Sequence, residues 1–446
     1  MAPPTISPET AAGLKKFIDD ATKPDADRTI LPAALVHIVD AQNNTLFSHG
    51  ASTEKPPTVE SMTIIQSLTK VVGAMAYMQL VERNLATLDD PATINKWLPE
   101  LAGKKVLTGY TTDSVTGQKQ YQLEERKGDI TARMLMNHTY GGGHTFFNKL
   151  LLDYVQDLGV WETTNEAADP YGILLVSPLL WHPGTKTNYG QGLDWLAVLI
   201  ERISKQSLQS YLQEHIFDPL GLKEIGVEAA YGGVATSLPH NTSKFWPRKL
   251  RTGNSSFVAV DVPEPEIVKR ANAFPEGEYH TGCLGTGLVS SVRDYNHLLS
   301  VLLPENMGLD HVTGHRLLSA ESVREITSPQ LPEEIRDDSR SIPTANATPI
   351  VLPADLSISV LDPKGSYGLG CGVQGVDRAL KNGGKGRSKG SVYWYGAPNC
   401  DMWVDREKGV VVSIWGNYYP WNDEAWVEFV AGVEGYVYEE LGSADE

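Results

Sequence analysis

Short β-rich runs occur near both ends of this chain, while segments with a helical period fill its middle, and this order restricts the folds open to it. Residues 33–50 contain two such runs around the turn sequence AQNN, and residues 390–416 contain three more, the last two joined by the turn REKG. From about residue 61 to 217 apolar side chains mostly recur at helical spacing. Because strands must pair, we expect one antiparallel sheet built from both termini, with a helical lobe inserted between its halves.

Helical patterns also lie outside these strands, at both ends of the chain. Residues 7–22 are expected to form a helix capped by Ser7, and residues 421–441 a helix capped by Asn422. These two helices are expected to flank the sheet. The fold class is therefore α+β, with an antiparallel sheet, flanking helices and an inserted helical lobe.

The length of 446 residues exceeds what one compact core usually accommodates. We expect a single domain over residues 1–446 with two lobes. The sheet lobe would take about residues 1–60 and 276–446, and the helical lobe about residues 61–275. Residues 232–275 are polar and irregular, which indicates an insertion or a loop over a site.

Charge and cysteine content restrict the partners and the compartment. Lys and Arg number 38 against 55 Asp and Glu, for a formal net charge of −17, which disfavours nucleic acid and anionic membranes as partners. The N-terminal residues lack the basic and then apolar order of a signal peptide, and the apolar runs are too short to span a bilayer. Cys283, Cys371 and Cys400 lie far apart without metal-type spacing. We expect a cytoplasmic protein with no metal and no cofactor.

The pattern Ser-x-x-Lys occurs twice, at Ser52 with Lys55 and at Ser67 with Lys70. Two prolines directly follow Lys55 and argue against a helix there. Apolar residues follow Lys70, so a helix beginning near Ser67 would place the lysine one turn away on the same face. A serine hydroxyl needs a base to become a nucleophile, and a lysine can serve where burial lowers its pKa. The structural alternative is a capping serine with a solvent-reaching lysine.

Two further segments carry residues suited to the same chemistry. In WHPGTKTNYGQGLDWL, residues 181–196, Tyr189 comes just before a helical pattern and could relay a proton. In residues 389–405 a strand ends at Gly396, and the backbone N–H groups near Ala397 could stabilise an oxyanion. The alternatives are an ordinary half-buried tyrosine and an aromatic edge strand.

The order of these three motifs resembles the serine β-lactamase and DD-peptidase superfamily, in its class C and esterase branch. The motifs are SLTK at residues 67–70, Pro-Gly at 183–184 before Tyr189, and Trp-Tyr-Gly at 394–396. Within that branch, YGQGLDWLAVLIER, KGSVYWYGAPN and YYPWND are similar to segments of the fungal lovastatin-type acyltransferases, which are transesterases of polyketide biosynthesis. The resemblance extends from about Leu31 to the C-terminus. It implies the β-lactamase fold and a single catalytic domain.

The resemblance also assigns roles to individual residues. Ser67 would be the nucleophile, Lys70 its base partner and Tyr189 the relay acid and base. The backbone N–H groups of Ser67 and Ala397 would form the oxyanion hole.

Departures from the β-lactamase pattern concern substrate binding. Trp394, Tyr395 and Gly396 stand where class C enzymes carry Lys-Thr-Gly, and Gln191 replaces an asparagine two residues after the tyrosine. These changes remove groups that hold a β-lactam and its carboxylate, so we expect an apolar Trp-Tyr rim suited to an ester or thioester. A carboxylate-binding cation would then have to come from Arg387 or Lys389.

Two rival motifs carry little weight. GRSKG at residues 386–390 matches Gly-x-Ser-x-Gly, but Ser388 lacks the preceding strand and following helix of a nucleophile elbow, so we expect a flexible loop. His138 and His144 show no metal-binding spacing and are expected to be structural.

Three functions follow from these observations. The first is transfer of an acyl group, through an ester on Ser67, to a small-molecule acceptor in secondary metabolism. The second is hydrolysis of esters or lactones, and the third is an inactive binding relative. The expected partners are a small-molecule acyl donor and acceptor. An acyl carrier protein would need a basic patch, for which the sequence offers residues 381–389, or this segment is simply a solvated turn.

Overall fold

The computed structural model describes residues 3–25, 27–159, 170–227, 244–259, 283–336, 342–343, 357–358, 361–362, 364–381 and 383–443. Its main sheet has seven strands in the order β12-β13-β14-β15-β16-β1-β2. Their bounds are Ala33–Asp40 (β1), Thr45–Ser52 (β2), Ser366–Tyr367 (β12), Gly372–Val373 (β13), Val392–Gly396 (β14), Cys400–Asp405 (β15) and Val410–Trp415 (β16).

All neighbouring strands of the main sheet are antiparallel, and β1 lies at the junction between the two ends of the chain. It pairs with β2 on one side and with β16 on the other, so that Leu35 faces Trp415 and Asp40 faces Val410. The prediction of one antiparallel sheet from both termini is confirmed.

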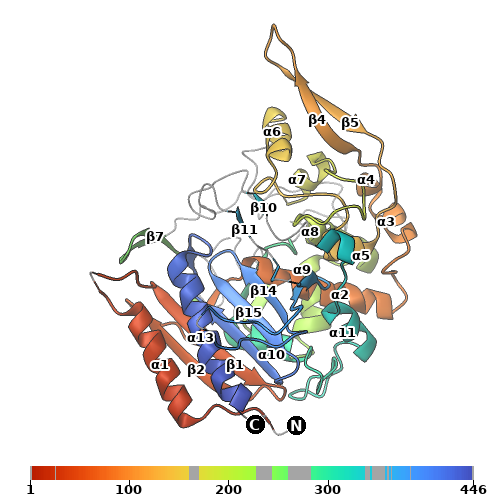
Figure 1. Cartoon of the computed structure of the whole chain (residues 1–446). Helices are drawn as coiled ribbons and strands as arrows, with labels where there is room; N and C mark the ends of the chain where they lie inside the picture. The colour runs from red at the N-terminus through yellow and green to blue at the C-terminus, as the bar shows by residue number, and fades with distance from the viewer. Residues whose placement is uncertain are drawn as a thin grey trace.

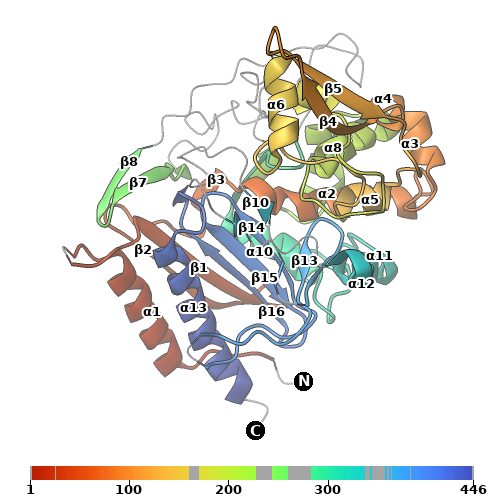
Figure 2. The same cartoon turned by 45° about the horizontal axis from the view of Figure 1, so that its top comes forward.

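Two terminal helices cover one face of this sheet. Helix α1 (Pro8–Thr22) and helix α13 (Glu424–Ser443) lie side by side across it (Figure 1, Figure 2). Ser7 caps α1 as predicted, because its Oγ accepts from the N–H of Thr10. The predicted cap of α13 is wrong by one residue, since Asp423 Oδ1 accepts the N–H of Trp426 at 2.9 Å. Asp423 is held in place by Arg251 and by the hydroxyl of Tyr418.

The opposite face is covered by helix α10 (Val292–Ser300), which packs on β1 and β16, and behind it lies the helical lobe. Helices α2 (Thr69–Glu82) and α8 (Gly192–Ser204) pack against each other at its centre. The remaining helical elements include α3 (Ala92–Trp97), α4 (Pro99–Ala102), α5 (Ala132–Met136), α6 (Lys149–Asp157), α7 (Pro170–Val176), α9 (Leu208–Leu212) with a π-helical turn (Gln213–Phe217), α11 (Ala320–Thr327) and α12 (Glu333–Arg336).

Small sheets complete the described structure. Strands β3 (Met62–Ile64), β9 (Leu288–Ser291) and β6 (Ile225–Val227) form one, and β17 (Tyr418–Tyr419), β7 (Lys249–Gly253) and β8 (Ser256–Ala259) another. The pair β10 (Ile342–Pro343) and β11 (Ser357–Ile358) is short. Strands β4 (Val106–Thr112) and β5 (Lys119–Glu124) form a hairpin that projects from the helical lobe (Figure 1).

Two expectations about the middle of the chain need correction. The β4–β5 hairpin lies in a region where the period indicated mostly helices. Within the polar segment 232–275, residues 244–259 contain β7 and β8, while residues 232–243 and 260–275 lie outside the described residues. Among the residues that the structure describes, no helix has both the length and the apolar character needed to cross a membrane.

Candidate active site

Ser67 lies in a single 3₁₀ turn, Gln66–Leu68, between the end of β3 and the start of α2. Gln66 adopts a left-handed φ of 49°, which is unfavourable for a residue with a side chain and needs support from its surroundings. Strand β3 supplies this support by pairing with β9, and the hydroxyl of Tyr295 donates to the carbonyl of Leu68 at 2.8 Å. The helix expected from about Ser67 therefore begins at Thr69, after a turn that fixes the serine.

Two side chains, one from helix α2 and one from the loop before α8, meet at Ser67 Oγ. Lys70 Nζ lies 3.1 Å from this atom and the hydroxyl oxygen of Tyr189 lies 2.8 Å from it. Lys70 is only 1% exposed and Tyr189 only 7% exposed, whereas Ser67 is half-buried. The hydroxyl is thus open on one side and contacts two groups that can exchange a proton with it.

Lys70 is held from a second direction by the chain before β9. Its Nζ donates to the carbonyl oxygen of Gly285 at 2.7 Å and lies 4.7 Å from the centre of the Tyr189 ring. Helix α2 allows this because the residues of its first three turns are buried on all sides. The ammonium group therefore points into the protein, toward the serine, and not toward solvent.

Aromatic rings surround Tyr189. Ring centroids lie 4.8 Å away for His138, 5.6 Å for Trp394, 5.9 Å for Phe147 and 6.2 Å for His144. These contacts fix the phenol over Ser67. The sequence analysis did not predict that His138 and His144 pack against Tyr189. The available signal was the run HTYGGGH, in which three glycines between the two histidines allow a tight turn.

Both histidines are buried beside Lys70. Burial, followed by the positive charge of Lys70, holds the pKa of His138 well below its usual value and lowers that of His144 to about 3. Each ring is therefore neutral at neutral pH, and His138 Nδ1 accepts the N–H of Gly190 at 3.3 Å. In the part of the chain that the structure describes, no three His, Cys, Asp or Glu side chains gather to hold a metal ion.

Strand β14 ends beside the serine turn. A Cβ on Gly396 would lie 2.6 Å from the carbonyl oxygen of Ile65, so only glycine allows this approach. Ala397 follows in the turn to β15 and is half-buried. Trp394 is 3% exposed and packs inside, so it does not form the expected rim. Tyr395 is half-buried, and the centre of its ring lies 6.3 Å from that of Trp421.

Three further residues named from the sequence, Gln191, Arg387 and Ser388, lie in the interior, whereas Lys389 is exposed. Gln191 is 4% exposed at the N-terminus of α8, two residues after Tyr189. Ser388 is also 4% exposed, and its N–H donates to Asp405 Oδ2 at 2.9 Å. Arg387 is buried against Asp362, with Nη2 to Oδ2 at 2.6 Å. The stretch 386–390 is therefore an anchored turn and not the flexible loop expected from its glycines.

A cation that sequence analysis missed lies close to the serine turn. Arg248 is 7% exposed and donates to the hydroxyl of Tyr419 at 3.0 Å and to the carbonyl of Ile64 at 3.4 Å. Among the described residues, no carboxylate lies within ion-pair distance of it. Only the fold could reveal this cation, since Arg248 and Ser67 are far apart in sequence.

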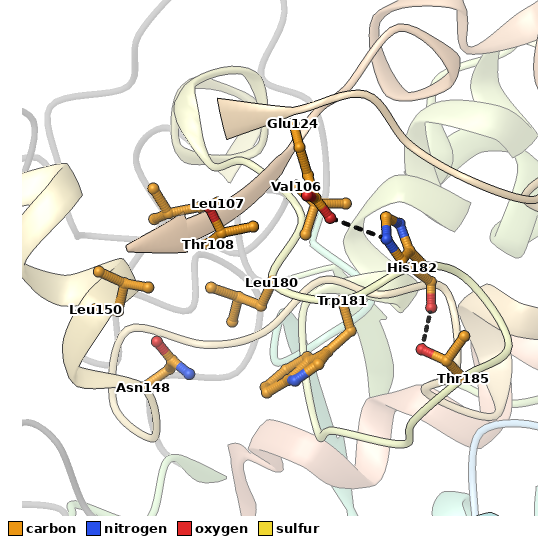
Figure 3. Close-up of a pocket in the computed structure, with 10 residues that line it drawn as sticks. All are labelled: Val106, Leu107, Thr108, Glu124, Asn148, Leu150, Leu180, Trp181, His182 and Thr185. Atoms are coloured by element: carbon orange, nitrogen blue, oxygen red, sulfur yellow. Dashed lines mark hydrogen bonds and ion pairs between the residues drawn. The ribbon is translucent and has the colours of Figure 1, made fainter. Parts of the chain in front are cut away.

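A cavity of about 400 Å³ opens beside the loop that leads to Tyr189 (Figure 3). Leucines and Trp181 form its walls, and His182 pairs across its edge with Glu124, Nε2 to Oε1 at 3.0 Å. Its lining residues are Val106, Leu107, Thr108, Glu124, Asn148, Leu150, Leu180, Trp181, His182 and Thr185. None of the residues that meet at Ser67 Oγ lines this cavity.

Comparisons with known proteins identify relatives of this chain and a solved structure with a similar fold. The chain is 27% identical over 427 residues to monacolin J acid methylbutanoyltransferase of Aspergillus terreus, covering 92% of each chain. It is 30% identical over 199 residues to lovastatin esterase of Penicillium rubens, covering 43% of this chain and 47% of the esterase. The unliganded structure of simvastatin synthase (LovD) from Aspergillus terreus superposes with a TM-score of 0.74 at 23% identity, over 97% of this chain and 99% of that one.

The family model described as Beta-lactamase matches residues 18–431. This match includes the serine turn, Tyr189 and the end of β14, and it leaves out only the two ends of the chain. The relatives include acyltransferases and an ester hydrolase, and the chain is an enzyme of one of these two kinds. The chain belongs to the β-lactamase family.

Proposed function

We propose that this enzyme transfers an acyl group, through an ester on Ser67, from a small-molecule ester or thioester to a small-molecule acceptor of secondary metabolism. The observation that carries the proposal is the meeting of Lys70 Nζ and the Tyr189 hydroxyl at Ser67 Oγ, at 3.1 and 2.8 Å. A hydroxyl held between two such groups can lose its proton as it attacks a carbonyl carbon.

In the first half of the reaction the donor acylates Ser67. Its Oγ attacks the acyl carbon as its proton passes to the pair formed by Lys70 and Tyr189, one of which enters this step without its own proton, as a neutral amine or a phenolate. The N–H groups of Ser67 and Ala397 stabilise the oxyanion of the tetrahedral intermediate, which the close approach of Gly396 to the serine turn favours. The donor's alcohol or thiol leaves with the proton that Tyr189 returns to it, and an ester on Ser67 remains.

In the second half the acceptor takes the donor's place. Its hydroxyl or amine loses a proton to the same pair and attacks the ester carbonyl, and Ser67 Oγ recovers its proton as it leaves. The enzyme returns to its starting state, so the kinetics are of the ping-pong type. The aromatic packing around Tyr189 keeps the phenol in reach for both halves.

The apolar surroundings of the site favour esters and thioesters over β-lactams. Trp394 packs against Tyr189 where a class C enzyme has a lysine, and Arg387 and Lys389 do not supply the missing charge, since one is bound to Asp362 and the other is exposed. A substrate carboxylate would be poorly compensated beside these rings.

A carrier protein as the source of the acyl thioester is part of this proposal. The exposed side chains of Lys381, Lys385 and Lys389 would receive an acidic carrier, while Arg387 between them is buried. Replacing the three lysines by glutamate should raise KM for a carrier-bound donor and leave kcat/KM for a free thioester unchanged. An equal effect on both donors would contradict carrier docking at this loop. The proposal also places the reaction in the cytoplasm.

The test of the main proposal is intact-mass spectrometry after exposure to a panel of acyl esters and thioesters. An increase by the mass of one acyl group, mapped to Ser67 and absent in Ser67→Ala, is expected. If no member of the panel modifies Ser67, the chain is a binding relative and the proposed mechanism is wrong.

Ester hydrolysis is the second candidate, because lovastatin esterase of Penicillium rubens is among the relatives. The two functions differ in what removes the acyl group from Ser67. Product analysis with an alcohol acceptor present and absent separates them. Transfer predicts that the new ester accumulates in proportion to the acceptor, whereas a hydrolase releases the free acid at the same rate in both cases.

A further inference from the structure

Asp194 is a buried carboxyl group that the acyl-transfer steps do not use directly. It lies in the first turn of α8, is 3% exposed, and follows Tyr189 by five residues. Its Oδ1 accepts the N–H of Gly285 at 2.7 Å and the thiol of Cys283 at 2.8 Å. Burial raises the pKa of this carboxyl, while the thiol, the charge of Lys70 and the Gly285 N–H act in the opposite direction.

Gly285 connects this carboxyl to Lys70. Its N–H points to Asp194 Oδ1, and its carbonyl oxygen accepts from Lys70 Nζ at 2.7 Å. A Cβ at position 285 would lie 2.6 Å from Asp194 Oδ1, so a side chain there would push the carboxyl away. The close contact therefore needs glycine, and it fixes the backbone whose carbonyl anchors the lysine.

Lys70 Nζ has two hydrogen-bond acceptors in the described structure, the Gly285 carbonyl and Ser67 Oγ. The carbonyl sets where Nζ lies when the serine proton moves. If Gly285 shifts, Lys70 loses its fixed anchor and the distance to Ser67 Oγ is no longer maintained. A displacement of about 1 Å in such a contact can slow the step about a hundredfold, because proton transfer depends steeply on geometry.

We propose that Asp194 is a positioning residue for acyl transfer, which holds the Gly285 backbone so that Lys70 stays within reach of Ser67 Oγ. This rests on the proposed function, since a positioned lysine has a role only if Ser67 is acylated. Asp194 touches no substrate atom in this mechanism. Its loss should lower kcat and leave KM nearly unchanged, because the surfaces that bind the acyl chain are untouched.

The experiment compares Asp194→Asn and Asp194→Ala with the unmodified enzyme on a short-chain aryl ester. The amide of asparagine can still accept the Gly285 N–H, whereas alanine cannot. We expect kcat to fall about threefold to tenfold in Asp194→Asn and about tenfold to a hundredfold in Asp194→Ala, with KM within twofold. If the alanine variant does not fold, the asparagine variant decides alone.

Glu201→Ala is the matched control. Glu201 is a buried carboxyl on the same helix and accepts a backbone N–H, that of Leu208 at 2.8 Å. Glu201→Ala should lower the stability of the enzyme as Asp194→Ala does, but it should leave kcat within twofold of the unmodified enzyme. An equal fall in kcat in this control, a rise in KM without a fall in kcat, or unchanged kcat in both Asp194 variants would overturn the positioning role.

A second readout separates this proposal from the function on which it rests. An aryl phosphonate that modifies Ser67 should react more slowly with both Asp194 variants, in the same order as kcat. If the unmodified enzyme gives no Ser67 adduct, the proposed function fails. If it gives the adduct and the variants react at the same rate, only the role of Asp194 fails.

Discussion

Simultaneous removal of Lys70 and Tyr189 tests whether the two groups act as one unit. Both contact the same atom, Ser67 Oγ, and the ammonium group lies 4.7 Å from the centre of the phenol ring. General acid and base help is worth about 10²- to 10⁴-fold in rate, or about 3–5 kcal/mol of barrier. We therefore expect Lys70→Ala and Tyr189→Phe each to lower the acylation rate at least about a hundredfold.

The double variant carries the decisive information. If Lys70 and Tyr189 share one proton, removing the second group costs little rate once the first is gone. The acylation rate of the double variant should then be close to that of the slower single variant. Independent groups would instead multiply their losses to about 10⁴-fold or more, so the expected coupling energy is about 3 kcal/mol or larger. Strictly multiplied losses would refute the shared-proton mechanism.

The assay is kcat/KM for an aryl ester, with single-turnover acylation rates for confirmation. Tyr77→Phe and Lys104→Ala are matched controls elsewhere in the helical lobe. The Tyr77 hydroxyl donates to the carbonyl of Thr87 at 2.7 Å, and Lys104 Nζ donates to that of Leu175 at 3.0 Å. Both should leave the rate within about twofold, which would assign the losses to the Ser67 contacts and not to general destabilisation.

Three further outcomes are expected. Ser67→Ala should abolish turnover at a cost of about 1 kcal/mol in stability, the usual size of a lost hydrogen bond, whereas Ser388→Ala should keep full turnover in the same assay. A short-chain aryl ester should give a higher kcat/KM than a chromogenic cephalosporin; a tenfold advantage for the cephalosporin would mean that Arg248 binds its carboxylate. Burial lowers the pKa of His37 to about 4. Between about pH 6.5 and 4 the unfolded chain therefore binds more protons than the folded one, and the free energy of unfolding decreases as the pH is lowered. The decrease is about 2 kcal/mol at pH 5 relative to pH 7. Denaturant titration at pH 7 and 5 should show a smaller difference for His37→Phe and an unchanged one for the exposed His311→Gln.

Five strands of the main sheet, β1, β2, β14, β15 and β16, were predictable from short β-rich runs bounded by turn residues, whereas the two-residue strands β12 and β13 were not predicted. Residues 410–415, for example, read VVVSIW between a Gly and a Gly-Asn pair, and the structure buries all six. The hairpin β4–β5 escaped detection because its strands are mostly exposed and polar, so neither face gives a strong apolar signal. The cap of α13 was misplaced because Asn422 and Asp423 are both good caps, and contacts with Arg251 and Tyr418 select the second.

The serine, the lysine and the tyrosine were identified by local motifs, but their supports were not. Asp194 lies 89 residues from Cys283 and 91 from Gly285, and no spacing in the sequence indicates that the three meet. The same holds for Arg248, which reaches the carbonyl of Ile64 because Phe245 and Trp246, just before β7, pair with Met62 in β3. Long-range contacts of this kind depend on the whole fold, and motif reading cannot supply them.

The pairing of β1 with β16 has a consequence for synthesis of the protein. Residues 33–40 leave the ribosome early, yet their partner strand, residues 410–415, is among the last to emerge. Until then one edge of β1 is exposed, and pairing between such distant segments is slow. The strand that ends at Gly396, beside the serine turn, is also made late. A nascent or truncated chain therefore carries the serine without a complete site around it, and we expect no acylation of Ser67 before the last strands are made.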